Sequence, residues 1–567
     1  MTAPHQQIEA KKTTTAAGSA WYERVLRPAV LLRLTFALTI VIYARTITFD
    51  WVFDDHIQVV LNPWLSSWSS LKQMFTLHSW AFSDYGFAGT YYRPLYLVWL
   101  LINNKLFGGT PGWFHLAGIF LHVGAVWLAF LTARRLLKDD RTAAIAALLF
   151  ALHPGKVESV AWVAGLTEPL LAVFFFGSVL GYLRWQQSQA REGKWLVVSV
   201  TCFAAALLSK ETAVFAPLLL LMHFGMSERP KPPFVRVARL ALPYAIVAIA
   251  YFGIRAIVMT GTNLGANLSI AKTLYTLPEA FLWYVQHTVW PFGLSLFYPE
   301  MIVRSAGARF VVPLVIDLAL LIGLVWLMRK SVTGTVMGLW FFLMLLPPLG
   351  AVLMVQPHDR YLYIPSFGAA VIAAGIIGKL PARWAAMVVA VIAIAFAVGS
   401  YRTTSYWEDD LHVFGRSMEV APDNPDARSA FAGSLMEAGQ KDRALAVLQE
   451  GFRRRPDSAK LVLMLAQTYQ SNGDWQNARR YYEEMVALSG DSRLMAMGHY
   501  GLGSLEEEQG NLQLAEEQYR RAISTASTAA GYHQRLGFLL QREGRLEEAK
   551  AEFAKEQEIR RQRTRNF

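Results

Sequence analysis

The sequence predicts an all-α protein in which a polytopic membrane bundle is followed by a domain of helical repeats. The first observation is composition: 54% of the 567 residues are hydrophobic and only 17% are charged, whereas a soluble protein carries about 25% charged residues. The second is that this deficit lies before residue 402, where apolar runs of membrane-spanning length recur. The third is a regular pattern of glycine and alanine after residue 405.

These observations divide the chain into four predicted segments. They are a cytoplasmic N-terminal tail at 1–27, a membrane domain at 28–402, a connecting helix or partial repeat at 403–424, and a repeat domain at 425–561 with about four repeats. No small-residue cleavage site follows the first apolar run, so we expect a retained anchor. The only cysteine, Cys202, excludes a disulfide within the chain and a thiolate zinc site.

Apolar runs in the membrane domain are expected to form about eleven spanning helices, and membrane helices tolerate the prolines within them. A shorter apolar helix begins at Tyr92-Arg93-Pro94 and ends near Phe107. With about 13 residues it is expected to lie at the membrane surface. The expected spans are 28–48, 113–134, 141–153, 167–184, 195–209, 212–224, 239–259, 307–328, 334–354, 361–379 and 383–401.

The loops between these spans predict the orientation of the chain. One set is short and rich in Lys and Arg, as cytoplasmic loops are, and the other includes the long loops 49–112 and 260–306, which are mixed in sign. We therefore expect the N-terminus inside and, with an odd number of spans, the repeat domain outside. These loops explain much of the net charge of +12, and no separate basic and aromatic patch indicates nucleic-acid binding.

The C-terminal part contains an internal repeat. Glycines recur at spacings of 34, 37 and 34 residues, and an alanine follows each of them by five residues. This pattern predicts tetratricopeptide repeats (TPRs), in which a glycine turn separates two amphipathic helices and small residues stand where the helices touch. The glycines are Gly439, Gly473, Gly510 and Gly544, and the alanines are Ala444, Ala478, Ala515 and Ala549.

Charged clusters on the predicted outer side suggest one polar site. Asp54 and Asp55 follow the first span, and adjacent carboxylates at a membrane surface are costly unless they have a function. One interpretation is a general base whose neighbour steers geometry or holds a metal. The other is that they cap a surface helix.

Three cations on the same side are candidates for binding a phosphate group. Arg93 and Arg360 offer guanidinium groups for bidentate neutralisation, although an interfacial arginine also serves as an anchor. Lys210 and Glu211 either bind a lipid phosphate or close on each other as an ion pair at a helix–helix turn. Tyr361 follows Arg360 directly.

His153 and Glu158, five residues apart, either share a helix turn or a metal, or make a structural hydrogen bond. Glu168 begins a span, where a carboxylate is favourable for the helix itself, so we expect no direct chemistry from it. No Walker loop, serine triad or dinucleotide fingerprint is present.

Several of these motifs together resemble one family. They are the acidic pair, Tyr-Arg-Pro-Leu (92–95), His-Pro-Gly-Lys-Val-Glu-Ser-Val-Ala-Trp (153–162), Ser-Lys-Glu (209–211), Trp-Tyr (283–284), Phe-Tyr-Pro (297–299) and Asp-Arg-Tyr-Leu-Tyr-Ile-Pro-Ser (359–366). The chain resembles a bacterial relative of the transmembrane and TPR O-mannosyltransferases, which belong to the GT-C superfamily of polytopic glycosyltransferases. One departure is Gly-Leu-Thr-Glu (165–168), where the family pattern has Gly-Arg-x-Asp and thus a basic residue that this chain lacks.

The resemblance implies inverting transfer of a sugar from a polyprenyl-phosphate donor to an acceptor outside the cytoplasm. It implies that Asp54 or Asp55 is the base, that Arg93, Lys210 and Arg360 lie near the donor phosphate, and that the repeats present a protein acceptor. In a bacterium, the protein is expected in the inner membrane with its repeats in the periplasm. Whether a divalent metal takes part is left open.

Our leading hypothesis is therefore a GT-C-type, mannosyltransferase-like enzyme that modifies a protein hydroxyl. The first alternative is transfer to a lipid or polysaccharide, with the repeats docking a partner protein. The second is a membrane-anchored TPR scaffold without enzymatic activity, against which the clustered charges argue. A transporter would instead place ionisable residues near the middle of the bilayer.

Overall fold

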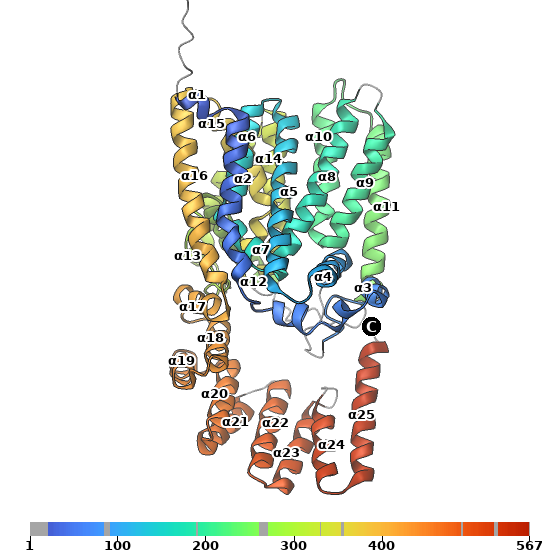
Figure 1. Ribbon diagram of the computed structural model, residues 1–567, viewed down its shortest axis with the longest axis vertical. Coiled ribbons are helices and arrows are strands. Elements are labelled where there is room, and N and C mark those ends of the chain that lie inside the picture. Colours follow the sequence, from blue (N-terminus) through green and yellow to red (C-terminus); the bar gives the residue numbers. More distant parts are fainter. Residues whose placement is uncertain are drawn as a thin grey trace, which may run out of the picture.

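The computed structural model describes residues 21–83, 91–188, 191–259, 270–328, 330–352, 356–488, 492–526 and 531–565. Within them the chain forms α-helices and short turns of helix, with no strand. The predicted all-α class, a membrane bundle followed by a TPR solenoid, is confirmed. The bundle stands upright in Figure 1 and the tail, residues 405–565, hangs beneath it; we call this end of the bundle the tail side.

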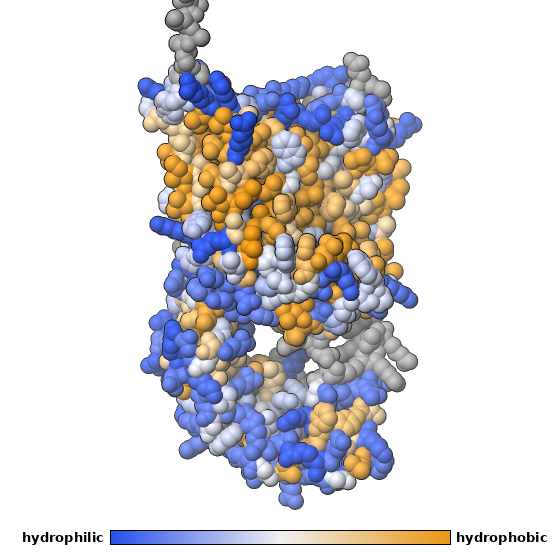
Figure 2. Space-filling model, in the orientation of Figure 1, coloured by the Kyte–Doolittle hydropathy of each residue, from blue (hydrophilic) through white to orange (hydrophobic). Residues whose placement is uncertain are grey.

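Each predicted span corresponds to one helix of the bundle. Figure 2 shows a broad apolar band around these helices, bordered by polar residues at both ends. The helices are α2 (Pro28–Ala44), α5 (Pro111–Leu137), α6 (Asp140–Leu152), α8 (Thr167–Gln187), α9 (Gly193–Ser209), α10 (Ala216–Ser227), α11 (Phe234–Val258), α13 (Ala308–Met328), α14 (Val332–Val352), α15 (Pro365–Ile377) and α16 (Ala382–Thr404).

By length and composition, only some of these helices qualify as membrane-spanning. Among the described residues, five helices are long and apolar enough to cross a membrane, or six if α6 and the segment Pro154–Ala161 form one bent span. Several others, such as α10 and α15, are shorter apolar helices. The predicted number of eleven therefore stays a prediction.

The bend after α6 positions part of the site. Asp139 caps the start of α6 by accepting from the backbone N–H of Thr142 at 2.9 Å, and the helix is buried from Thr142 to Leu152. It ends at His153 because the residue before a proline disfavours helical geometry. The chain turns by 60° into the segment Pro154–Ala161, which contains α7 (Val157–Ala161).

The stretch predicted as a long loop, 260–306, contains a helix that the apolar runs did not predict, α12 (Ile270–Val289). Its apolar residues occur at helical spacing, so that Thr276, Ala280 and Tyr284 are buried on one face. Its polar residues keep the stretch below the hydropathy of a spanning helix. A search for continuous apolar runs therefore misses it.

Short helices fill the tail side of the bundle around the predicted acidic pair. The chain first forms α1 (Trp21–Val25) at the other end, and α4 corresponds to the predicted surface helix. The remaining elements are η1 (Arg45–Thr48), η2 (His56–Val60), η3 (Pro63–Ser66), η4 (Trp68–Ser70), α3 (Leu71–Thr76), α4 (Pro94–Phe107), η5 (Pro154–Lys156), η6 (Ala164–Leu166), η7 (Glu211–Phe215) and η8 (Asp359–Leu362).

The tail is a curved stack of helix pairs that returns beneath the bundle, with α25 coming up toward α3 in Figure 1. Its four turn glycines have positive φ angles of 74°, 77°, 82° and 80°, and the four alanines that follow them are buried. The elements are η9 (Ser405–Trp407), α17 (Asp410–Val420), α18 (Pro425–Glu437), α19 (Lys441–Arg454), α20 (Ala459–Ser471), α21 (Trp475–Leu488), α22 (Ser492–Glu508), α23 (Leu512–Thr525), α24 (Tyr532–Arg542) and α25 (Leu546–Arg565).

The turn glycines give a stability prediction. We expect Gly473→Val to destabilise its repeat by at least about 1–2 kcal/mol, because a side chain strains the left-handed conformation. Hydrogen exchange of α20 and α21 should rise. Gly433→Ala is the matched control, since Gly433 lies inside α18 with open space around its Cα and alanine favours helix. Equal exchange in both variants would contradict the expectation.

Candidate active site

Four segments that are far apart in the sequence meet at the tail side of the bundle. The four segments are the loop 50–55 after η1, the start of α4, the bent segment with α7, and η8. The turn between α9 and η7 lies beside them. Every predicted cluster named above comes from one of these segments or borders it. The contacts between them form two halves, one around Arg360 and one around Arg93.

Arg360 joins η8 to α7 and lies close to Asp54. The Glu158 carboxylate accepts from the backbone N–H of Arg360 at 2.8 Å and pairs with its guanidinium. His358 Nδ1 lies 3.5 Å from the same carboxylate. Burial raises the pKa of Asp54 to about 6, and the charge of Arg360 limits that rise. Asp54 is half-buried and its carboxylate accepts no hydrogen bond from the described residues.

Asp55 has different surroundings from Asp54. Its carboxylate is fully buried and accepts from the backbone N–H of Ala164 at 2.7 Å and of Val52 at 3.3 Å. Burial raises the pKa of Asp55 to about 8, while these two backbone hydrogen bonds lower it. Asp55 thus ties the loop 50–55, which we call the acidic loop, to η6, whereas the Asp54 carboxylate has no hydrogen-bond partner among the described residues.

The second half of the site contains two ion pairs, in which the sequence neighbours Lys210 and Glu211 each pair with a residue from another segment. Arg93 Nε donates to Glu211 at 3.1 Å and its Nη2 donates at 2.7 Å, a bidentate pair. Lys210 pairs with Glu168, and both are almost completely buried. The interpretation of Lys210 and Glu211 as a self-contained pair is therefore wrong. Lys210 has extended backbone at the end of α9, so neighbouring side chains point in opposite directions.

Tyr361 connects the two halves. Its ring lies 4.8 Å from Lys210 Nζ and 5.0 Å from the Arg360 guanidinium, within the range of cation–π attraction. Arg93 lies over the ring of Tyr91 at 4.1 Å. The structure thus brings together Asp54, Glu158, Arg360, Tyr361, Lys210, Glu211 and Arg93.

Each of the two arginines is held by a glutamate. Glu211 binds the Nε and Nη2 edge of Arg93, whereas Glu158 accepts from Nη1 and from the backbone N–H of Arg360. The side chains of Arg93 and Arg360 remain 14% and 15% exposed. Arg93 Nη1 and Arg360 Nη2 donate to no described residue. Each arginine therefore presents free N–H donors, fixed in place, to a further anion.

His153 is used for structure. Its Nε2 lies 3.0 Å from the backbone oxygen of Thr288, and its Nδ1 accepts from the backbone N–H of Gly155 at 3.1 Å. Both ring nitrogens are occupied, so the ring stabilises the bend after α6. It does not share the cluster around Arg360.

Sequence reasoning missed two residues that support the site. Glu168 is the partner of Lys210, although we expected it to act only on its own helix. Lys156 is fully buried and donates to the backbone oxygen of Tyr363 at 2.7 Å and to Ser366. It thereby holds the 359–366 segment against the bend. The position of Lys156 within the 153–162 motif could have indicated this supporting role from the sequence. No group of three or more His, Cys, Asp or Glu that could hold a metal occurs among the described residues.

Comparison with known proteins supports the resemblance. Residues 79–261 match the family model of dolichyl-phosphate-mannose-protein mannosyltransferase. Residues 429–493 and 463–530 match that of the tetratricopeptide repeat.

Curated relatives and a solved structure show similarity of different extents. Protein O-mannosyl-transferase Tmtc1 of Drosophila melanogaster is 34% identical over 185 residues, which is 32% of this chain and 21% of that protein. Protein O-mannosyl-transferase TMTC4 of Homo sapiens is 32% identical over 210 residues, 34% of this chain and 28% of that protein. The matches thus span less than a third of these relatives. ArnT from Cupriavidus metallidurans, crystallised with undecaprenyl phosphate, aligns over 81% of each chain with 14% identity and a TM-score of 0.39.

Proposed function

We propose that this chain, a relative of the transmembrane and TPR O-mannosyltransferases, is a membrane glycosyltransferase of the GT-C type. It transfers a hexose, of which mannose is the leading candidate, from a polyprenyl phosphate to a hydroxyl group of an acceptor protein. The observation that carries the proposal is the Asp54 carboxylate, unpaired among the described residues, close to Arg360 in a site whose other half holds Arg93; each arginine is paired with a glutamate.

The mechanism is a single displacement. Asp54 takes the proton of the acceptor hydroxyl as its oxygen attacks the anomeric carbon of the sugar. The bond from that carbon to the phosphate oxygen breaks, and the electron pair leaves on the polyprenyl phosphate. Arg93 and Arg360 stabilise the charge that develops there, aided by Lys210. Attack opposite the leaving group inverts the anomeric configuration.

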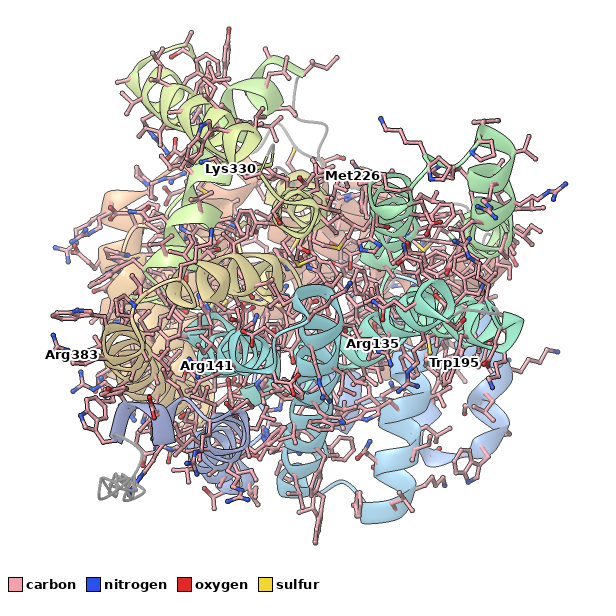
Figure 3. All side chains as sticks on the ribbon, turned by 90° about the horizontal axis from the view of Figure 1, so that it is seen from above. Arg135, Arg141, Trp195, Met226, Lys330 and Arg383 are labelled. Atoms are coloured by element: carbon pink, nitrogen blue, oxygen red, sulfur yellow. The ribbon has the colours of Figure 1, made fainter. Side chains whose placement is uncertain are left out.

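We further propose that the site faces the periplasm of a bacterial inner membrane, with the N-terminus in the cytoplasm. Figure 3, which views the end of the bundle away from the tail, labels several basic residues at that end, namely Arg135, Arg141, Lys330 and Arg383. Short loops rich in Lys and Arg are retained in the cytoplasm. The tail side then lies outside, where lipid-linked sugars are used.

The repeat domain is the proposed receptor for the acceptor polypeptide. Stacks of this kind form extended concave surfaces that bind other chains. The tail curves back beneath the site, and Figure 2 shows an opening between the apolar body and the middle of the tail. An extended polypeptide held there would lie below the tail side of the bundle.

The test is transfer in lipid nanodiscs that contain the purified full chain. The reaction contains polyprenyl-phosphate mannose or glucose and a Ser/Thr-rich polypeptide, with and without EDTA to determine metal dependence. We expect stoichiometric polyprenyl phosphate and sugar-modified polypeptide by mass spectrometry, with the inverted linkage by NMR. Sugar found on lipid or polysaccharide instead would support the first alternative. No transfer from any hexose donor would refute the proposal.

The surroundings of Asp54 predict a pH dependence. Its pKa is raised to about 6, and only the ionised carboxylate accepts the proton. Activity is therefore present above pH 6 and lost as the pH falls through that value. We expect kcat/KM to decline about tenfold per pH unit well below it. A profile that stays flat to pH 4.5 in a protein that remains folded would rule out Asp54 as the base.

A further inference from the structure

Asp410, at the start of α17 in the tail, binds Phe53 and His56, the residues on either side of Asp54 and Asp55. The backbone N–H of Phe53 donates to Asp410 Oδ1 at 2.8 Å, and His56 Nε2 lies 3.0 Å from Oδ2. Phe53 and His56 flank Asp54 and Asp55 directly in the sequence. A single carboxylate from a distant part of the chain thus contacts residues on both sides of the candidate base, Asp54.

The loop needs such support because its backbone is strained. Phe53 has a φ of +52°, in the left-handed region that side chains other than glycine rarely adopt. A backbone conformation of this kind raises the free energy of the folded protein by about 1–3 kcal/mol, and it persists only when surrounding contacts hold it in place. The hydrogen bond from the Phe53 N–H to Asp410 acts on the strained residue itself, one position before Asp54.

Other contacts fix the start of the tail against the same loop. The backbone N–H of Asp50 donates to the backbone oxygen of Glu408 at 3.0 Å. The rings of Phe53 and Phe414 lie 5.9 Å apart, edge to face. Because α17 also contacts α18 of the first repeat, the loop and the repeat domain share one packed junction.

We propose that Asp410 is a positioning residue that holds Asp54 in the orientation required for proton abstraction, so that the first helix of the tail completes the active site. This inference rests on the proposed function. It assigns the tail a role in the chemical step, in addition to binding an acceptor. Asp410 itself contacts neither donor nor acceptor.

The test compares three variants of the full chain in nanodiscs. We expect Asp410→Ala to lower kcat about 10- to 100-fold, the cost of a misplaced catalytic group, while KM for the donor changes less than about twofold. Asp410→Asn keeps an oxygen acceptor for the Phe53 N–H and should retain more activity. Asp409→Asn is the matched control, because Asp409 caps α17 through the His412 N–H at 2.9 Å, contacts the His412 ring, and makes no hydrogen bond to the described residues of the loop 50–55. It should leave kcat unchanged.

Two further measurements separate this inference from the proposed function. Hydrogen exchange of residues 50–60 should rise in Asp410→Ala and stay at the wild-type level in Asp409→Asn, whether or not the assay uses the correct sugar. Single and double variants of His56 and Asp410 should be non-additive in kcat, because the two side chains contact each other. Equal kcat and equal exchange in the Ala and control variants, or fully additive effects, would overturn the inference. Absence of transfer by the wild type would refute the proposed function alone.

Discussion

Replacement of Asp54 by asparagine should lower kcat about 10²- to 10⁴-fold, the usual contribution of a general base, while the protein stays folded and binds its donor. The amide keeps the shape of the carboxylate but accepts no proton. Because Asp54 accepts no hydrogen bond from the described residues, its replacement leaves none of their donors unpaired. The measurement is sugar transfer under saturating donor and acceptor, with donor affinity determined separately by polyprenyl-phosphate binding.

Asp55→Asn is the matched control in the neighbouring position. Burial raises the pKa of Asp55 to about 8, which favours the protonated form that cannot take a further proton. The substitution leaves one of two backbone donors, the N–H of Val52 or Ala164, with a poorer partner, at a cost of about 1–3 kcal/mol in stability. We expect lower thermal stability and at most a tenfold loss of kcat. A larger kcat loss for Asp55 than for Asp54 would exchange their roles.

Much of the fold was predictable because its signals are local. Continuous apolar runs located the helices of the bundle, and the turn glycines located the repeats, since a positive φ selects glycine. The helix α12 was missed because its apolar residues are spread over a helical period. The position of the charged clusters at one end of the bundle followed from chain connectivity.

The pairing within the site was not predictable, because it joins distant segments. Arg93 and Glu211 are separated by 118 positions, and no sequence pattern indicates which glutamate each cation contacts. The distinction between Asp54 and Asp55 depends on two backbone donors, one of them on η6. The contact of Asp410 with the acidic loop joins positions 354 and 357 apart in the sequence and arises only when α17 packs against the loop.

The glutamates of the site explain how so many cations remain near a membrane. An isolated buried charge is costly, and removing one partner of a buried pair typically destabilises a protein by about 3–5 kcal/mol. Glu158 and Glu211 fix the two arginines before a phosphate arrives, and Glu168 does the same for Lys210. Because these groups are already ordered, little reorganisation is needed when negative charge develops on the leaving group.

Arg360→Gln should have the second large effect, because Arg360 acts on both the leaving group and the base. Loss of one stabilising donor typically lowers kcat about 10²- to 10³-fold. In addition, the charge of Arg360 lowers the pKa of Asp54, against the larger effect of burial. Without that charge the pKa of Asp54 rises above about 6, so the acid limb of the kcat/KM profile should move to higher pH.

Arg360→Lys and Arg93→Gln separate the two effects of Arg360. Lysine retains the charge and should keep the acid limb near its original pH, although the bidentate geometry is lost. Arg93 belongs to the other half of the site, so Arg93→Gln should lower kcat without moving the limb. A limb at the same pH in wild type and Arg360→Gln would show that Arg360 does not tune the base. If the acid limb of the kcat/KM profile moves equally in Arg93→Gln, the pKa of Asp54 depends on the net charge of the whole cluster. A local effect of Arg360 requires that only the Arg360→Gln variant shifts the limb.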